Sequence, residues 1–361
     1  MSPVYNFNAG PAMLPPPVLE QVQAELRDYH GRGMSIMEMS HRSKEYEAVN
    51  AQAEETFKRL LGVGDGYRVL FVQGGASTQF AMVPMNFLAP GTTVDVVMTG
   101  SWAEKALEEA AALGQAREAA STKAGGYRRV PRPDEITYSP DCAYVHLTSN
   151  ETIQGIQFQQ FPDVGDRPLV ADMSSDILSR PFDASKFALI YAGAQKNLGP
   201  SGVTAVLLRE AWLAKANKKV PTMLRYSTHV KNNSLYNTPP SFGVYVLNLV
   251  LQWIDRAGGL TAMAERNARK AKTLYDVIDN SGGFYRGHAE ADSRSHMNVT
   301  FRLANEALEK QLVSEAQAAG MVGLAGHRSV GGLRASIYNA VPLEACQALA
   351  ALMTDFAKRN G

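Results

Sequence analysis

The sequence predicts an α/β fold: a mostly parallel sheet covered on both faces by helices, followed by a smaller α+β domain. Short apolar runs alternate with helical patterns through the first two thirds of the 361-residue chain. This alternation is typical of buried parallel strands joined by crossover helices. After about Gly258 the pattern changes to long helical segments separated by a few short strands. A chain of this length can bury a large core and form two domains.

Two helices are expected before the sheet. The prolines 15–17 open the first, and from Val18 onward its apolar residues recur every four positions. Ser43 can cap the second helix. We expect an irregular loop over 34–42 between them.

Strands and helices then alternate as a layered sheet requires, with helices over 78–88 and 102–113. Ligands of such sheets bind beyond the carboxyl ends of the strands, so polar residues at these positions are the first site candidates. The expected strands cover 67–72, 94–98, 143–147, 169–171, 187–191 and 203–208.

The second part of the chain is expected to form the smaller domain, although no linker rich in Pro or Ser marks the boundary. We assign 16–258 to the large domain, and 1–15 together with 259–361 to the small one. The expected helices and strands after the boundary cover 261–279, 297–303, 305–319, 333–338 and the residues after Pro342.

Composition excludes several classes of protein. Lys and Arg number 36 against 35 Asp and Glu, a net charge of +1 that favours neither a nucleic-acid nor a membrane-surface partner. Cys142 and Cys346 are too few for a disulfide framework or a four-ligand zinc site. The first residues lack a signal-like pattern, and polar residues interrupt the longest apolar stretch, 242–254. A cytoplasmic protein is expected.

Lys196 is the candidate for covalent chemistry. It follows the apolar run 187–191 in a loop bounded by glycines, and Asp172 ends another apolar run, 168–171. An amine and an acid at neighbouring strand ends suggest pyridoxal phosphate, whose aldehyde needs a lysine and whose ring nitrogen needs a carboxylate. A single loop lysine is more often merely solvated, so other residues must support this interpretation.

Further residues could complete a cofactor site. The turn 74–77 lies between a strand and a helix, where free N–H groups suit a phosphate, although glycines are common there for steric reasons. It matches neither the dinucleotide fingerprint nor the P-loop. Trp102 could stack on a flat ring or belong to the core. Thr152 could bind a phenolic oxygen or be a plain turn residue, and 237–238 could bind a ligand or cap a helix.

Basic residues in loops rich in Gly and Ser suggest an anionic substrate. The pairs His41-Arg42 and His327-Arg328 and the nearby Arg334 could together bind two separate anionic groups, because guanidinium forks match carboxylate and phosphate. Any single pair is more often solvated. The histidines show no metal-ligand spacing, and there is no zincin motif or nucleophile elbow.

Six stretches spread over almost the whole chain carry a family resemblance: 6–15, 40–42, 74–77, 191–200, 236–240 and 326–340. In these stretches the sequence resembles the phosphoserine aminotransferases, fold type I pyridoxal phosphate enzymes of the class V aminotransferase group. The last stretch separates this family from other class V enzymes. The resemblance implies a large domain with a seven-stranded sheet and a homodimer.

The resemblance also implies roles around the cofactor ring. Lys196 would bind one pyridoxal 5'-phosphate per subunit as a Schiff base and then shuttle a proton between the substrate Cα and the cofactor C4′. Asp172 would keep the ring nitrogen protonated. Trp102 would stack on the ring, and Thr152 would hydrogen-bond its 3′ oxygen.

The cofactor phosphate is expected to bind Ala76, Ser77 and Gln195, with Asn237 and Thr238 arriving from the neighbouring subunit. Some family members carry Gly and Arg where this chain has Ala76 and Ser77, so backbone N–H groups and the Ser77 hydroxyl remain for the anion.

The substrate anions would meet a second set of residues. Arg334 is expected to bind the α-carboxylate. His327 and Arg328, with His41 and Arg42 from the partner, would bind the distal phosphate or the glutamate γ-carboxylate.

The implied reaction is reversible amino transfer from glutamate to 3-phosphohydroxypyruvate, giving O-phospho-L-serine and 2-oxoglutarate in serine biosynthesis. A phosphorylated hydroxythreonine of pyridoxine biosynthesis is a second expected substrate. A cysteine desulfurase would need a cysteine in 326–334, and a glyoxylate-type aminotransferase would not need so many cationic groups. A binding module that keeps the fold without chemistry would be colourless.

Overall fold

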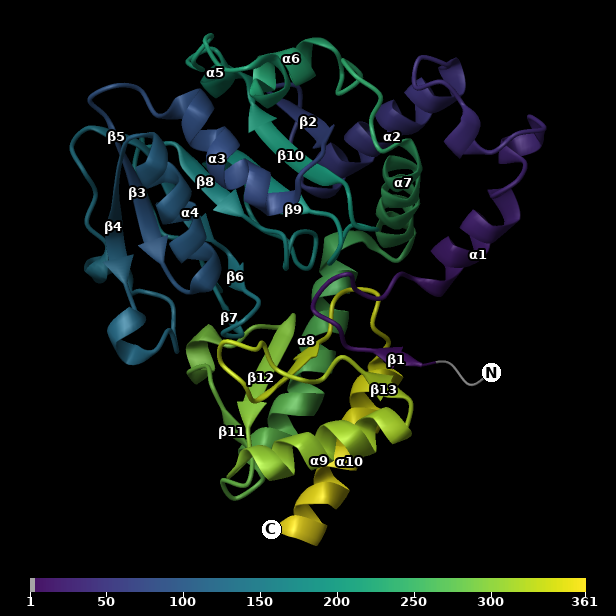
Figure 1. Cartoon of the computed structure of the whole chain (residues 1–361), viewed down its shortest axis with the longest axis vertical. Coiled ribbons are helices and arrows are strands. Elements are labelled where there is room, and N and C mark those ends of the chain that lie inside the picture. The colour runs from purple at the N-terminus through teal and green to yellow at the C-terminus, as the bar shows by residue number, and fades with distance from the viewer. Residues whose placement is uncertain (1–3) are drawn as a thin grey trace.

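The structure, a computed structural model, describes residues 4–361 (Figure 1). Within these residues, the two largest sheets have seven strands and three strands, and two further sheets are single strand pairs. The larger sheet has seven strands, and only β10 runs antiparallel to its neighbours, which confirms the predicted mostly parallel seven-stranded sheet. The strand order is β2 (Tyr67–Val72), β10 (Thr204–Arg209), β9 (Phe187–Gly193), β8 (Leu169–Asp172), β5 (Cys142–Thr148), β3 (Thr93–Met98) and β4 (Gln115–Ser121).

Helices cover both faces of this sheet. Because successive residues of a strand point to opposite faces, the apolar runs feed two cores. One core packs the sheet against α2 (Lys44–Leu60) and α7 (Ser241–Arg256), and the other packs it against α3 (Gly75–Phe87) and α4 (Ser101–Leu113). The remaining helices of this part are α1 (Pro16–Glu25), α5 (Glu210–Leu213) and α6 (Tyr226–Lys231). Of these, α1 contacts α7.

The second part is smaller and has its own core. Its helices lie below the large sheet in Figure 1, and the first of them runs down from the large part. The elements are α8 (Gly259–Asp279), β11 (Arg286–Gly287), β12 (Asn298–Arg302), α9 (Glu306–Ala318), β13 (Met321–Val322), β14 (Leu333–Ser336) and α10 (Leu343–Asn360). The three-stranded sheet has the order β11-β12-β14.

The start of the chain joins this second part. The strand β1 (Tyr5–Asn6) pairs in parallel with β13, and Phe7 is fully buried in the second core. The assignment of 1–15 and 259–361 to one domain stays a prediction, as does the boundary of the large domain at 16–258. A hairpin of β6 (Asn150–Glu151) and β7 (Ile156–Gln157) lies close to both parts (Figure 1).

Several elements were not predicted, and β4 and α7 are the longest of them. β4 is an edge strand whose residues are mostly half-buried or exposed, so its sequence lacks the apolar run that marks the central strands. α7 coincides with the longest apolar stretch of the chain, for which the sequence pattern predicts no element, and its residues 244–251 are all buried. Among residues 4–361 no helix is long and apolar enough to cross a membrane.

Candidate active site

Lys196 lies in a tight turn directly after β9, at the edge of the sheet where the parallel strands end. The N–H groups of Leu198 and Gly199 both donate to the Ala194 carbonyl, at 3.1 and 2.9 Å. The Lys196 Nζ donates to Thr152 Oγ1 at 2.7 Å. Burial lowers the pKa of Lys196 to about 8, although nearby carboxylates oppose the shift. A substantial fraction of this amine is therefore neutral near physiological pH.

Asp172 is the last residue of β8, the strand beside β9. Its side chain is buried, and Oδ1 accepts the Ser174 N–H at 2.8 Å. Burial raises the pKa of Asp172, while the Ser174 hydrogen bond and the charge of Lys196 act in the opposite direction. The structure thus brings the predicted amine and acid to neighbouring strand ends.

Trp102 lies in the first turn of α4, and its ring centroid is 5.4 Å from the Lys196 Nζ. Its Nε1 is buried and has no hydrogen-bond partner among residues 4–361. The indole, Thr152 and Lys196 therefore meet at one place, with the aromatic ring close to the amine.

Glu151 is a residue of this site that sequence reasoning missed. It is fully buried, and its carboxylate accepts the Trp102 N–H at 3.2 Å and the Ala103 N–H at 3.0 Å. A Cβ on Gly100 would lie 2.6 Å from Glu151 Cδ, so the glycine makes room for this approach. Burial raises the pKa of Glu151 to about 7. Its position directly before Thr152 was the only local signal.

The predicted phosphate turn lies beside the lysine loop. Gly74 has φ of 94°, a conformation that glycine favours, and α3 begins at the next residue without a side-chain cap. An ideal Cβ on Gly193 would be 3.8 Å from the Ala76 nitrogen. The uncapped N–H groups of Ala76 and Ser77 therefore start a helix close to the end of β9, which is a favourable place for an anion.

Gln195 is fixed by the start of the chain. The Ala12 N–H donates to the Gln195 carbonyl at 2.8 Å, and a Cβ on Gly10 would lie 3.5 Å from the Gln195 side chain. The segment around residue 10 therefore runs along the lysine loop.

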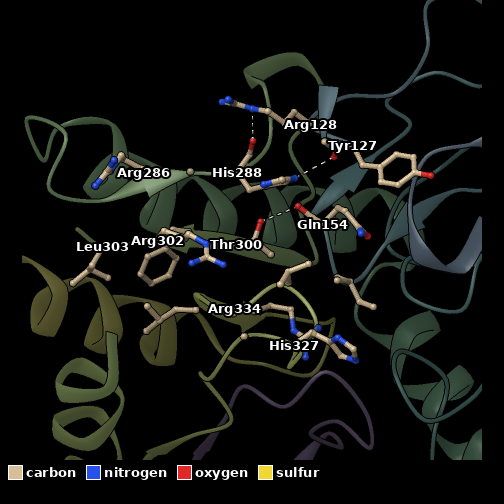
Figure 2. A pocket seen from close by; sticks show the side chains of 18 of the residues that line it. Tyr127, Arg128, Gln154, Arg286, His288, Thr300, Arg302, Leu303, His327 and Arg334 are labelled. Atoms are coloured by element: carbon tan, nitrogen blue, oxygen red, sulfur yellow. Dashed lines mark hydrogen bonds between the residues drawn. The ribbon is translucent and has the colours of Figure 1, made fainter. Parts of the chain in front are cut away.

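Arg334 and His327 line one cavity of about 900 Å³ (Figure 2). Arg334 lies on β14, its Nη1 donates to the Thr152 carbonyl at 3.4 Å, and its buried Nε has no partner among residues 4–361. His327 and the exposed Arg328 lie in the loop before β14. Burial, Arg334 and Arg328 together lower the pKa of His327. The cavity thus begins next to Thr152 and has a cationic lining.

Four predicted residues form no hydrogen bond with the lysine within the described part of one chain. His41 lies in a turn just before α2, and its Nε2 is buried without a partner among the described residues. Arg42 is exposed, and so are Asn237 and Thr238. No hydrogen bond within 4–361 links any of the four to Lys196. Asn237 instead lines a second cavity beside Gly74.

The two cysteines lie away from the site, and the described residues form no metal cluster there. Cys142 begins β5, so it lies at the opposite edge of the sheet, and Cys346 is buried in the second core. Within the described part of the chain, no three His, Cys, Asp or Glu side chains are grouped as a metal ion requires.

The fold and this site are those of a class V aminotransferase. The model of that family matches residues 4–349, and the chain belongs to the family. Among individual proteins, the chain is highly similar to phosphoserine aminotransferases. The one from Herpetosiphon aurantiacus is 64% identical over 99% of both chains. The solved structure of the one from Bacillus circulans subsp. alkalophilus has a TM-score of 0.98 and 61% identity over 100% of both chains.

A solved structure of pyridoxal phosphate-bound phosphoserine aminotransferase from Trichomonas vaginalis is more distant. It is 40% identical and has a TM-score of 0.93, covering 97% of this chain and 99% of the other.

Proposed function

We propose that this chain is a pyridoxal phosphate-dependent phosphoserine aminotransferase. It transfers the amino group of glutamate to 3-phosphohydroxypyruvate and forms O-phospho-L-serine and 2-oxoglutarate, a step of serine biosynthesis. The observation that carries the proposal is the meeting of Lys196, Asp172 and Trp102 at one sheet edge, in a chain that is 64% identical to a phosphoserine aminotransferase over 99% of both chains.

The residues at this edge fit the cofactor group by group. When bound, pyridoxal phosphate supplies an electrophilic carbon for the amine and a ring that withdraws electrons from the bond being broken. A partly neutral Lys196 suits attachment, because the neutral amine is the nucleophile. Asp172 suits a protonated ring nitrogen. The indole ring of Trp102, close to the Lys196 Nζ, suits stacking on the cofactor ring, and Thr152 Oγ1, which accepts a hydrogen bond from Nζ, suits the 3′ oxygen.

The phosphate of the cofactor is assigned to the start of α3. Backbone N–H groups of Ala76 and Ser77, the Ser77 hydroxyl and the Gln195 side chain bind it from this chain. Asn237 and Thr238 of the partner subunit complete the site, a role supported by their exposure and by the lack of any hydrogen bond between them and Lys196 within residues 4–361.

In the reaction, this chain's residues orient the substrate and move one proton. Arg334 binds the α-carboxylate through its guanidinium fork, which places the substrate Cα next to Thr152 and Lys196. Lys196 Nζ would take the proton from the substrate Cα and deliver it to the cofactor C4′. His327 and Arg328, with His41 and Arg42 of the partner subunit, bind the distal phosphate or γ-carboxylate.

We place these sites in a homodimer. Support comes from His41, Arg42, Asn237 and Thr238, none of which forms a hydrogen bond with Lys196 within residues 4–361. Further support comes from exposed apolar side chains in the same segments of the chain. These are Leu19, Leu26, Met34, Met37 and Tyr236. The free thiols of Cys142 and Cys346 are compatible with a cytoplasmic location.

A second substrate, the phosphorylated hydroxythreonine of pyridoxine biosynthesis, shares the same two anionic groups. The cavity of about 900 Å³ beyond Arg334 offers room for its longer carbon chain.

The test is amino transfer to 2-oxoglutarate from phosphoserine or from serine. We expect turnover with phosphoserine to exceed turnover with serine by about 100-fold or more, because each charge-assisted hydrogen bond to the phosphate contributes roughly 1.5–3 kcal/mol. Lys196→Ala abolishes turnover, whereas Lys186→Ala, which changes an exposed lysine just before β9, does not. Equal rates with serine, or an active Lys196→Ala protein, contradict the proposal.

A further inference from the structure

Two arginines stand directly opposite each other on one face of the smaller sheet. β11 and β12 are antiparallel, and their register pairs Arg286 with Arg302. The other face of β12 carries Val299 and Phe301, which are buried in the second core, so Thr300 and Arg302 point away from that core. Like charges directly opposite each other destabilise a strand pair. An anion between the two side chains would reverse this effect.

The cavity that these arginines line has a uniformly basic character. Its volume is about 900 Å³, and no Asp or Glu belongs to its lining. Figure 2 shows the charged residues gathered around it from both parts of the molecule. The six basic members are Arg128, Arg286, His288, Arg302, His327 and Arg334.

Little of this charge is neutralised within the chain. Among residues 4–361, Arg286 and Arg128 form no ion pair, and Arg302 reaches only Glu309, at 4.0 Å. Glu309 also accepts the Leu303 N–H at 3.3 Å. Positive charge without a counter-charge in a concave site raises the local concentration of small anions.

The cavity wall is held in place across the two parts of the molecule. Arg128 Nε donates to the His288 carbonyl at 3.1 Å, and the His288 ring pairs with the Tyr127 carbonyl at 3.3 Å (Figure 2). Thr300 Oγ1 donates to the Gln154 carbonyl at 2.9 Å. Burial lowers the pKa of His288, and the charges of Arg128 and Arg302 lower it further, which reflects the positive field inside the cavity.

The backbone positions of the opposed pair lie further along the three-stranded sheet than Arg334. Thr300 is the cross-strand partner of Arg334, and Arg302 is two residues further along β12, about 7 Å at the usual rise per residue. Arg286 is one more strand away, about 5 Å. The Arg302 guanidinium reaches back toward the loop before β14, where an ideal Cβ on Gly331 would lie 3.0 Å from its Nη2, so Arg286 is the residue of the pair further from a substrate held at Arg334.

We propose that Arg286 and Arg302, with Arg128 at the rim, form a second anion site that binds a phosphate dianion in the cavity outside the substrate position. The assignment of its role rests on the proposed function: a phosphate-bearing substrate is captured here before it moves to Arg334 and His327. The binding itself does not depend on that role. Guanidinium forks on two adjacent strands match the several oxygens of one phosphate.

The test is calorimetric titration of the cofactor-loaded protein with inorganic phosphate at low ionic strength. We compare wild type with Arg286→Gln/Arg302→Gln and with a control of equal charge change, Arg256→Gln/Arg269→Gln, whose exposed residues lie outside the cavity lining. Wild type and control are expected to bind a second phosphate per subunit that the cavity variant lacks. An Arg328→Gln protein should lose the other phosphate and keep this one.

Two readouts keep the outcome decisive. The single variant Arg286→Gln removes the repulsion between the two opposed arginines, so it should fold. Because it also removes charge-assisted hydrogen bonds to the anion, its affinity for the second phosphate should fall about tenfold or more. In turnover, the cavity variant should raise KM for phosphoserine and leave kcat unchanged. Unaltered phosphate binding in both cavity variants overturns the proposal, even if amino transfer proceeds. Absence of amino transfer in a wild type that binds both phosphates contradicts only the proposed function.

Discussion

At the scale of single residues, the surroundings of Lys196 favour its neutral amine. Burial brings its pKa from the ordinary 10.5 to about 8, against the pull of Asp172 and Glu151. The neutral form is the nucleophile that attaches an aldehyde. A lysine in water would be almost wholly charged at neutral pH, so the fold itself prepares this residue for covalent chemistry.

This pKa predicts how fast the cofactor-free protein takes up pyridoxal phosphate. We expect the second-order rate constant to rise with pH and to level off above about 8, where most of the Lys196 amine is neutral. Stopped-flow absorbance gives the rate, and Lys196→Ala supplies the baseline. A rate constant that keeps rising toward pH 10.5 would show that the lysine is unperturbed.

At the scale of secondary-structure elements, α4 is anchored to the site through its first turn. Glu151 accepts the N–H groups of Trp102 and Ala103, so a single carboxylate sets the position of the indole next to Lys196. A helix start leaves several N–H groups without partners inside the helix, and in a buried place they need an acceptor such as this carboxylate.

The raised pKa of Glu151 makes this anchor sensitive to pH. Its pKa is about 7 in the folded protein against an ordinary 4.5, so the folded state binds the proton more tightly. Its contribution to stability is complete below pH 4.5 and is lost as pH rises through about 7.

We therefore expect the free energy of unfolding of the cofactor-free protein to decline between these pH values. In Glu151→Gln the free energy of unfolding should decline less steeply, because the titrating carboxyl is gone. Some decline should persist, because burial also raises the pKa values of Asp172 and Asp176. Urea titrations at a series of pH values measure both slopes. Identical slopes would mean that Glu151 titrates as an exposed carboxylate does.

Sequence patterns predict the largely buried strands of the large sheet. The strands that became β2, β9 and β10 read as apolar runs, and Lys196 and Asp172 were found because they follow such runs. β4 escaped because an edge strand needs no apolar run. Glu151 escaped because its partners, two backbone N–H groups nearly fifty residues earlier, leave no trace in the local sequence.

At the scale of the whole molecule, buried polar contacts join the lysine loop to the second part of the chain. Asn197, next to Lys196, accepts the Asn339 N–H at 3.0 Å, and Asn150 Nδ2 donates to Asn298 Oδ1 at 2.8 Å. Because a buried polar group without a partner costs free energy, these contacts fix how the two parts meet around the cavity.

The proposed dimer predicts complementation between two inactive proteins. One carries Lys196→Ala and the other carries His41→Ala with Arg42→Ala. In the heterodimer, one site draws Lys196 from the second subunit and His41 and Arg42 from the first. If the sites are shared, the purified heterodimer should recover about half of the wild-type turnover, as expected when one of two symmetric sites is intact.

Coexpression with two different affinity tags yields the heterodimer for this assay, and each parent homodimer serves as the control. A heterodimer as inactive as its parents would place His41 and Arg42 at the site of their own chain.

The visible absorption spectrum of the protein tests the central claim most directly. After incubation with pyridoxal phosphate and removal of the excess, we expect a visible band from the cofactor attached to Lys196. Phosphoserine should deplete this band and 2-oxoglutarate should restore it, whereas serine at the same concentration should leave it nearly unchanged. A protein that remains colourless, or whose band does not respond to phosphoserine, would contradict the account.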